Sequence, residues 1–235
     1  MKVLSFSQQG SRNYQQDNLY ISEEKQIFAV CDGVGGSADG FLASNMVVNS
    51  LQSQYPGHAT LHDKDSIGDY LFDVLSAFRH DQFEEIATTM TFLTIVGPTA
   101  FLYHIGDSRI FYISPSRSKW YVTKDHSYVQ ELFEAGILTS ENEMRTHPMR
   151  NRITKVISNT NPLTQQDIEI ETIHDVLPGD MFLLCSDGAL ESFSNEDLVY
   201  HFSDNHIPLD LQWNSFQEIC AQNSKDNNTA ILVSI

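Results

Sequence analysis

The chain has 235 residues, of which 41% are hydrophobic and 19% are charged, and its formal net charge is −17. This composition is typical of a globular protein with a buried core and excludes a disordered or fibrous chain. The excess of carboxylates also argues against binding to nucleic acid or to an anionic membrane, because both depend on clustered Lys and Arg.

Features along the whole chain predict one soluble, cytoplasmic, monomeric domain over residues 1–235. No repeat, low-complexity tract or linker divides the sequence. The first residues lack the pattern of a signal peptide, and no apolar run approaches the roughly 18 residues of a membrane span. The three cysteines are far apart in apolar runs and are expected to be reduced core residues.

Short segments rich in β-branched and aromatic residues predict strands. In chain order these are residues 3–7, 26–31, 90–96, 99–105, 109–113, 168–173, 181–185 and 229–233. Turn sequences such as Gly97-Pro98 join neighbouring strands and favour antiparallel hairpins. Helical spacing and end signals predict helices over 41–52, 66–78 with Ser66 as N-cap, 126–135 and 209–223. Hairpins with separate helices indicate an α+β fold.

Aspartates stand at the ends of several predicted strands, usually beside a glycine. They are Asp32, Asp107, Asp187 and Asp226. An ionised carboxylate buried beside a strand end needs a compensating partner, and an adjacent glycine lets the backbone approach a ligand closely. A single Asp-Gly pair is a common turn, so the evidence lies in the repetition.

Carboxylates that converge from strand ends suit Mg²⁺ or Mn²⁺ better than zinc, which favours His and Cys. Two such ions about 3.5–4 Å apart can lower the pKa of a bridging water and neutralise a phosphoryl oxygen. The pattern therefore predicts metal-dependent hydrolysis of a phosphate ester.

Taken in chain order, the motifs resemble those of the protein phosphatase 2C-like, metal-dependent serine/threonine phosphatases of bacterial type, and the resemblance covers nearly the whole chain. The matching segments are residues 10–17, 32–36, 88–89, 106–109, 123–127, 185–188 and 226–229. The resemblance implies a four-layer α-β-β-α sandwich with two mainly antiparallel central sheets.

The same resemblance implies a role for each motif residue. Arg12 would bind the substrate phosphate and Asp17 would order metal-bound water. Asp32 would bridge two ions, with the carbonyl of Gly33 serving one and Asp187 and Asp226 completing the other. Asp107 would help to hold a third, weaker ion. A water or hydroxide bridging the two Mn²⁺ or Mg²⁺ ions would attack phosphoserine or phosphothreonine.

The resemblance also implies phosphorylated proteins as substrates, an opposing serine/threonine kinase, and a flap beside the active site at about residues 125–165. A basic run lies in this segment: Arg145, His147, Arg150, Arg152 and Lys155. It would either select acidic or phosphorylated substrate sequences or pair with nearby glutamates.

The chain departs from the family pattern in two places. Gln15 and Gln16 stand where many members carry Asn and Glu, which removes one carboxylate near the metals. Val34 stands where animal members place a histidine thought to act as general acid, so another group would protonate the leaving oxygen.

Two other functions remain open from the sequence. One is a catalytically weak or inactive phosphatase-fold module that binds phosphorylated partners, because a fold alone does not establish activity. The other is a nicotinamide-dependent oxidoreductase, since residues 33–38 fit the GxGxxA fingerprint. Against it, the next parallel strand with a terminal acidic residue is missing, and Asp32 would repel the pyrophosphate.

Overall fold

Two five-stranded antiparallel sheets form the centre of the molecule, which is a computed structural model that describes residues 1–35, 38–57, 60–76, 78 and 85–235. The first sheet has the order β1 (Lys2–Gln8), β13 (Asn228–Ser234), β12 (Met181–Cys185), β8 (Arg109–Ser114) and β9 (Lys119–Val122). The second has the order β11 (Glu171–Ile173), β7 (Thr99–Ile105), β6 (Met90–Val96), β3 (Ile27–Cys31) and β2 (Asn18–Ser22).

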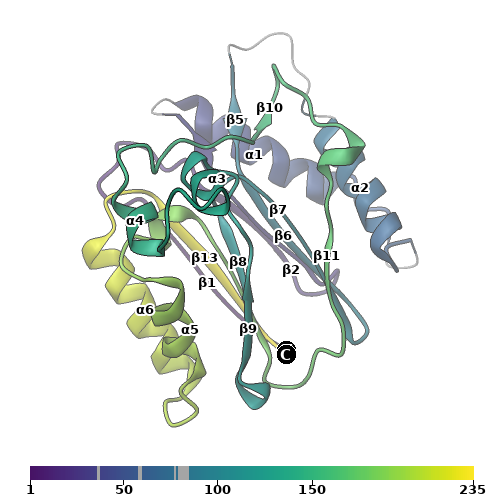
Figure 1. The fold of residues 1–235 in the computed structure, drawn as a ribbon. Helices are drawn as coiled ribbons and strands as arrows, with labels where there is room; N and C mark the ends of the chain where they lie inside the picture. Colours follow the sequence, from purple (N-terminus) through teal and green to yellow (C-terminus); the bar gives the residue numbers. More distant parts are fainter. Residues whose placement is uncertain (36–37, 58–59, 77, 79–84) are drawn as a thin grey trace.

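Helices cover the outer face of each sheet (Figure 1). The second sheet carries α1 (Ala38–Ser53) and α2 (Lys64–Ser76), whereas the first carries α5 (Asn195–Ser203) and α6 (Leu209–Asn223). Buried clusters lie between each helix pair and its sheet, and a third lies between the sheets. The predicted four-layer α-β-β-α sandwich is thereby confirmed.

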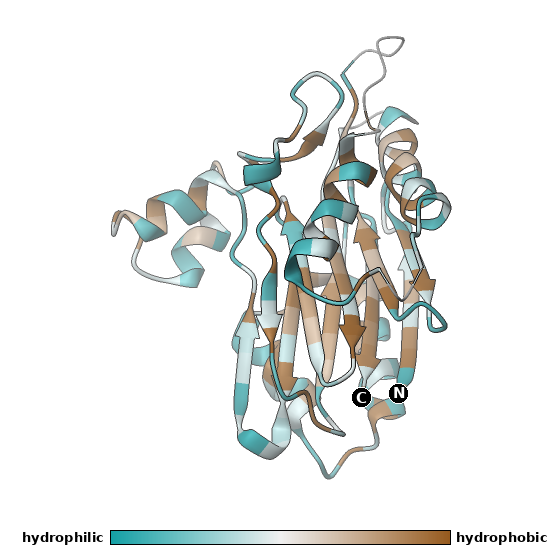
Figure 2. Cartoon of the chain, turned by 90° about the vertical axis from the view of Figure 1, so that its right-hand side faces the viewer, coloured by the Kyte–Doolittle hydropathy of each residue, from teal (hydrophilic) through white to brown (hydrophobic). Residues whose placement is uncertain are grey.

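Burial on both faces explains why β3 and β12 are continuously apolar. In β12, Phe182 and Leu184 point to the core between the sheets, while Leu183 and Cys185 point to the core under α5 and α6. A strand covered on both sides needs apolar residues throughout. Figure 2 shows this as brown strands inside more hydrophilic helices.

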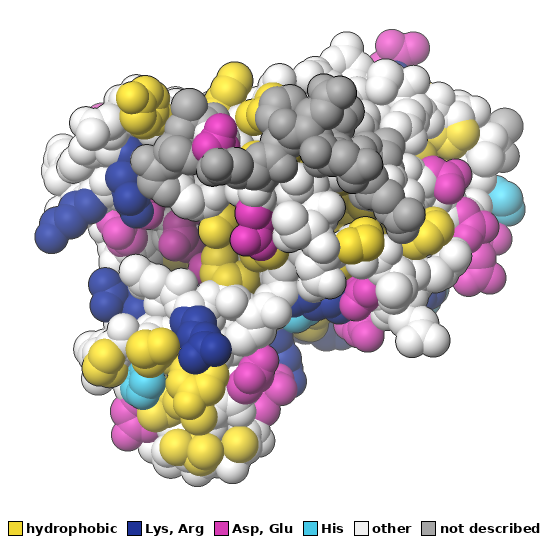
Figure 3. Space-filling model, turned by 90° about the horizontal axis from the view of Figure 1, so that it is seen from above, with side chains coloured by type: hydrophobic (Ala, Val, Ile, Leu, Met, Phe, Trp, Pro, Cys, Tyr) yellow, Lys and Arg dark blue, Asp and Glu magenta, His cyan; other side chains and the backbone are white. Residues whose placement is uncertain are grey.

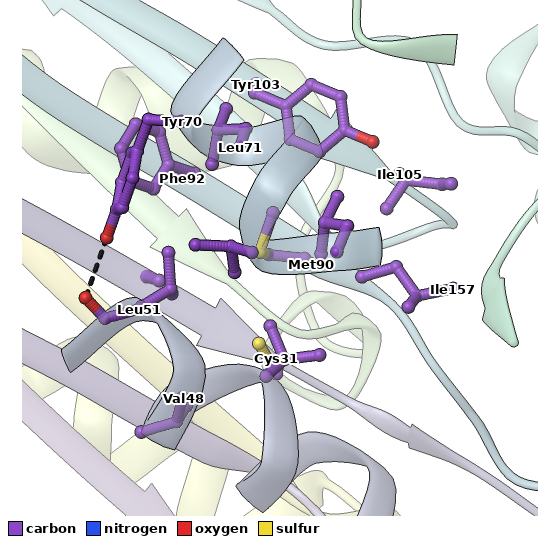
Figure 4. Packing of buried hydrophobic residues seen from close by; sticks show 14 of the residues in the cluster. Cys31, Val48, Leu51, Tyr70, Leu71, Met90, Phe92, Tyr103, Ile105 and Ile157 are labelled. Carbon is purple, nitrogen blue, oxygen red and sulfur yellow. Dashed lines mark hydrogen bonds between the residues drawn. The ribbon is translucent and has the colours of Figure 1, made fainter. Parts of the chain in front are cut away.

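The core under α1 and α2 contains a hydrogen bond that joins the two helices (Figure 4). The hydroxyl of Tyr70 on α2 donates to the carbonyl oxygen of Leu51 on α1 at 2.7 Å. The ring of Tyr70 also lies 6.4 Å from that of Phe92 on β6. Because this buried hydroxyl has a partner, the tyrosine adds apolar area without the cost of an unpaired polar group.

The described residues contain several elements that were not predicted. A small sheet has the order β10 (Ile157–Ser158), β5 (Ala87–Thr88) and β4 (Gly33–Val34). Between β9 and β10 the chain forms α3 (Tyr128–Glu134), which corresponds to the predicted helix 126–135, and α4 (Glu141–Thr146), which was not predicted. Three short helices were not predicted either: η1 (Pro115–Arg117), η2 (Gln165–Asp167) and η3 (Asp187–Leu190). The sequence also did not predict α5, β2 and β9.

Three expectations need correction. Ser66 is not the N-cap, because α2 begins at Lys64 and the carboxylate of Asp63 accepts the Ser66 amide hydrogen at 2.9 Å. The predicted strand 168–173 is extended only over Glu171–Ile173. All strand pairs in the described residues are antiparallel, so these residues lack the parallel unit that the oxidoreductase hypothesis requires.

Parts of one motif and of one predicted helix lie outside the described residues. Gly36 and Ser37, which complete the glycine-rich segment after Asp32, lie outside the described residues, as does residue 77 near the end of the predicted helix 66–78. No helix within the described ranges has both the length and the apolar character needed to cross a membrane.

Candidate active site

Strand pairing brings the first and last matching segments to one end of the first sheet: the opening motif, residues 10–17, and the closing motif, residues 226–229. β13 lies between β1 and β12, with Asn228 opposite Gln8 and Ala230 opposite Cys185. Asp226 therefore lies just beyond the same end of the sheet as Asp187. Asp32 follows β3 of the facing sheet and interacts with both Asp17 and Asp187.

Asp17 is the most buried of these carboxylates, with only 3% of its surface exposed. The hydroxyl of Ser186 donates to its Oδ2 at 2.8 Å, while its Oδ1 has no hydrogen-bond partner among the described residues. Burial, and more weakly the charges of Asp187 and Asp226, raise the pKa of Asp17 to about 7. This carboxylate therefore has an oxygen available for a ligand.

Asp32 is held by its backbone. Its carbonyl oxygen accepts hydrogen bonds from the Thr88 hydroxyl and the Thr89 amide, both at 2.8 Å, and its amide donates to the Thr89 hydroxyl at 3.1 Å. Burial and the neighbouring charges of Asp17 and Asp187 raise the pKa of the Asp32 carboxyl well above its usual range. The side chain is thus fixed where its negative charge is unfavourable.

Two further aspartates of the group, Asp187 and Asp107, behave in the same way. Burial and the charge of Asp226 raise the pKa of Asp187 to about 6, although a hydrogen bond with Asp32 partly offsets them. Burial and then Asp187 raise the pKa of Asp107. The four carboxyls Asp17, Asp32, Asp107 and Asp187 therefore share one region in which negative charge is poorly compensated.

Asp226 is compensated by Arg12, which was predicted to receive a substrate phosphate. A terminal nitrogen of Arg12 donates to Asp226 Oδ2 at 2.5 Å, and 52% of the arginine side chain is exposed. Asp226 and the nearby Asp187 and Asp32 raise the pKa of the Arg12 guanidinium. Arg12 is thus an exposed cation at the edge of the carboxylate group.

Two glycines beside the aspartates allow close approach of the backbone. A Cβ added to Gly33 would lie 2.1 Å from the carbonyl oxygen of Gly40 on α1, and one added to Gly188 would lie 2.0 Å from that of Asn227. A side chain at Gly33 would therefore push α1 away from the loop after Asp32. A side chain at Gly188 would separate the segments that carry Asp187 and Asp226.

The donors in this region fit a hard divalent cation. They are carboxylate and carbonyl oxygens, the carboxyls repel one another, and Asp17 Oδ1 is buried without a partner. Across the described part of the chain, no three His, Cys, Asp or Glu side chains already form a metal-binding cluster. The Asp32 carboxyl nevertheless interacts electrostatically with Asp17, Asp187, Asp107 and Asp226, so these carboxylates share one site.

A pocket of about 420 Å³ opens beside the carboxylates. One wall carries Asp107, Asp187 and Asp226, and the other belongs to residues 125–165 and includes Met144, Arg145 and Arg150. Figure 3 shows basic and acidic side chains gathered around this hollow, next to the protruding lobe formed by α3 and α4.

Known proteins resemble this chain in sequence and in fold. The family model described as protein phosphatase 2C matches residues 7–225. The chain belongs to the protein phosphatase 2C family. A putative protein phosphatase 2C-type of Streptococcus pyogenes serotype M6 is 30% identical over 199 residues, which are 80% of this chain and 78% of the relative.

Other members of the phosphatase 2C family are similarly related. Serine/threonine protein phosphatase PstP of Mycobacterium tuberculosis is 32% identical over 197 residues, which are 78% of this chain but 35% of the relative. The structure of the S. agalactiae serine/threonine phosphatase has a TM-score of 0.84 at 27% identity and covers 100% of this chain and 99% of its own. The PstP catalytic domain solved with two manganese ions has a TM-score of 0.78, at 24% identity, over 98% of this chain and 96% of its own.

Sequence reasoning missed one residue that organises this phosphatase 2C site. The Asn227 side chain accepts the Gln16 amide hydrogen at 2.9 Å and donates to the carbonyl oxygens of Gln9 and Tyr14 at 2.8 and 2.9 Å. It thereby fixes the opening motif against the closing one. The only sequence signal was its place beside Asp226.

Ser186 and Gln16 were also missed as supporting residues. Besides its bond to Asp17, the Ser186 hydroxyl accepts the Thr229 amide hydrogen at 3.0 Å. The Gln16 carbonyl oxygen accepts hydrogen bonds from the Ser44 hydroxyl at 2.6 Å and the Gly33 amide at 3.3 Å. Thus Gln16, which the sequence marked as a departure, links the opening motif to the loop after Asp32 through its backbone.

Proposed function

We propose that this chain is a metal-dependent protein phosphatase that hydrolyses phosphoserine and phosphothreonine. The observation that carries the proposal is the convergence of Asp17, Asp32 and Asp187 from three separate motifs. Burial, with added repulsion from neighbouring aspartates, raises the pKa of each carboxyl, and Asp187 lines an open pocket. Such carboxylates need cations, and cations beside a pocket provide a place for a phosphate.

Each residue has a role in this proposal. Asp32, Asp187 and Asp226, with the Gly33 carbonyl, would hold two Mn²⁺ or Mg²⁺ ions, and Asp107 would contribute to a third. When bound, these ions would activate water and neutralise phosphoryl oxygens. Asp17, with a free Oδ1 next to this group, would orient water and accept its proton. Arg12, an exposed cation beside Asp226, would bind the substrate phosphate.

The setting of the enzyme also belongs to the proposal. Residues 1–235 would act as one monomeric, cytoplasmic catalytic domain that opposes a serine/threonine kinase in signalling. Its substrates would be phosphorylated proteins, which approach along the pocket between the carboxylates and a flap at about residues 125–165. The flap wall of the pocket supports this approach route.

The test is release of phosphate from a phosphothreonine peptide in Mn²⁺ and in EDTA, by wild type and by Asp32→Ala and Asp187→Ala. We expect release that requires Mn²⁺ and is lost in both variants, whereas exposed Asp73→Ala serves as the matched control and retains it. Folded wild type that releases no phosphate from several phosphopeptides would instead favour a module that binds phosphorylated partners without turnover.

A further inference from the structure

Four basic side chains line the pocket beside the carboxylates, and two of them are already engaged. Arg109 forms a bidentate pair with Asp125 at 2.6 and 2.7 Å. Arg145 donates to the carbonyl oxygens of Glu191 and Phe193 at 2.9 and 2.5 Å. These two cations stabilise the walls and have little capacity left for a ligand.

The other two basic side chains are Arg150 and Lys225, and both are exposed. Within the described residues, neither side chain has an ion pair or a hydrogen bond. Arg150 comes from segment 125–165, and Lys225 directly precedes Asp226, so the two residues reach the pocket from segments far apart in the sequence. Two cations that are unpaired in the described part of the chain therefore line one cavity.

The nearby glutamates do not neutralise Arg150. Glu134 pairs with Lys124 at 3.0 Å, and Glu143 accepts the Thr139 amide hydrogen at 2.6 Å. Glu141 lies 3.9 Å from Arg145, the one member of the basic run with which a flap glutamate pairs. The hypothesis of local pairing thus fails for Arg150.

The rest of the basic run is directed elsewhere. Arg152 lies over the ring of Tyr128, 5.3 Å from its centroid, and Lys155 pairs with Asp167 at 2.9 Å. Neither residue lines the pocket. The basic run as a whole therefore does not select the substrate. The available cations are Arg150, which belongs to the run, and Lys225, which does not.

The acidic residues of the pocket are also largely accounted for. Asp107, Asp187 and Asp226 belong to the proposed metal site, and Asp125 and Glu141 pair with arginines. Glu191 accepts the backbone amide hydrogen of Lys225 at 2.6 Å and is the only other pocket carboxylate among the described residues. The side chains left for a ligand therefore carry more positive than negative charge.

We infer that Arg150 and Lys225 form a second anion subsite, which makes this chain select phosphoproteins with a carboxylate or a second phosphate close to the phosphorylated residue. The inference rests on the proposed function, because the first phosphate must lie at the carboxylate-bound ions. Asp187 and Asp226 line the same pocket as the two cations, so an anion only a few residues away along the substrate reaches them. Cation-to-phosphate and cation-to-carboxylate contacts supply the selectivity.

The experiment compares kcat/KM, in Mn²⁺, for a phosphothreonine peptide with neutral flanks, one with glutamates on either side, and one with an added phosphoserine. We expect wild type to prefer the anionic peptides, by about threefold for each cation, as for exposed charge pairs. Arg150→Gln and Lys225→Gln should each lower that preference about threefold, and the double variant should bring it close to one. A larger effect for phosphoserine than for glutamate would identify phosphate as the better occupant.

Lys64→Gln and Lys119→Gln are the matched controls, because both remove an exposed lysine outside the pocket, and both should keep the wild-type preference. Binding of the dephosphorylated peptides, measured by fluorescence anisotropy in Mn²⁺, gives a readout that does not require turnover. It should show the same dependence on Arg150 and Lys225, and the dependence should weaken with added salt.

The outcomes separate the two ideas. Hydrolysis of all peptides with equal kcat/KM, or a preference that survives in the double variant, would overturn the subsite and leave the phosphatase intact. Absence of hydrolysis with any peptide would overturn the proposed function, while the anisotropy comparison would still decide whether the two cations bind the anionic flank.

Discussion

The hydroxyl of Ser186 donates a 2.8 Å hydrogen bond to the buried carboxylate of Asp17, and so joins residues 169 positions apart. Replacing Ser186 with Ala removes this donor and the acceptor for the Thr229 amide. We expect the free energy of unfolding to fall by about 1–3 kcal/mol, because buried polar groups lose their partners. Urea denaturation measures the loss. Exposed Ser116→Ala should change little, and an equal effect of both variants would contradict this role of Ser186.

Asn227 should contribute to metal affinity although it is not a proposed ligand. Asn227→Ala removes three hydrogen bonds that hold residues 9–16 against the closing motif. We expect Mn²⁺ affinity to fall about tenfold, as for other residues that orient ligands. Calorimetric titration with Mn²⁺ gives the affinity. Asn223→Ala, which removes a local bond to Ile219 on α6, is the control, and unchanged Mn²⁺ binding in Asn227→Ala would refute the prediction.

The stability of the metal-free protein should decrease as pH rises from about 4 to about 7. Folding raises the pKa of Asp187 to about 6 and that of Asp17 to about 7, so in this window the folded state binds more protons than the unfolded state. The free energy of unfolding in EDTA should therefore be lower at about pH 7.5 than at about pH 5.5.

Asp187→Asn should reduce the dependence of the free energy of unfolding on pH. It should also stabilise the metal-free protein near neutral pH by about 1 kcal/mol or more, since it removes a poorly compensated charge. Mn²⁺ should stabilise wild type and not this variant. Urea denaturation at both pH values tests the claim. Asp73→Asn, on the exposed side of α2, is the control, and a steeper slope in Asp187→Asn would show that the charges are compensated in another way.

Arg145 should fix α4 against the segment that follows Asp187. Its guanidinium donates to the carbonyl oxygens of Leu190, Glu191 and Phe193. A lysine keeps the charge but cannot reproduce this planar set of donors. In Arg145→Lys we expect faster hydrogen exchange at the amides of Glu141–Thr146 and a loss of about 1–2 kcal/mol of stability. Lys124→Gln, which breaks the exposed pair with Glu134, is the comparison, and equal exchange in the two variants would argue against this anchor.

Sequence patterns predicted the elements whose environment is uniform. β6 and β12 are buried along nearly their whole length, so apolar and β-branched residues fill them, and both strands were located at their observed bounds. β2 was missed because every residue in it is only partly buried. In α5 the buried residues are just Leu198 and Phe202, too few to give a clear helical period.

The residues of the candidate active site could also be predicted only in part. The aspartates could be proposed from the sequence, because their types and motif order are local features. The pairing of Arg12 with Asp226, and the contacts of Asn227 with backbone atoms of residues 9–16, depend on segments more than 200 positions apart. No local pattern records such contacts. The predicted start of α2 was wrong for another reason: Asp63 and Ser66 are both good capping residues and lie three positions apart.

The position of β13 between β1 and β12 also has a consequence for biosynthesis. The proposed ligand Asp226 and its neighbour Asn227 lie just before β13, and one edge of this strand pairs with β1, which is more than 200 residues earlier in the sequence. The two halves of the proposed metal site therefore cannot meet until both β1 and β13 have left the ribosome. A nascent chain that still lacks β13 would remain catalytically silent.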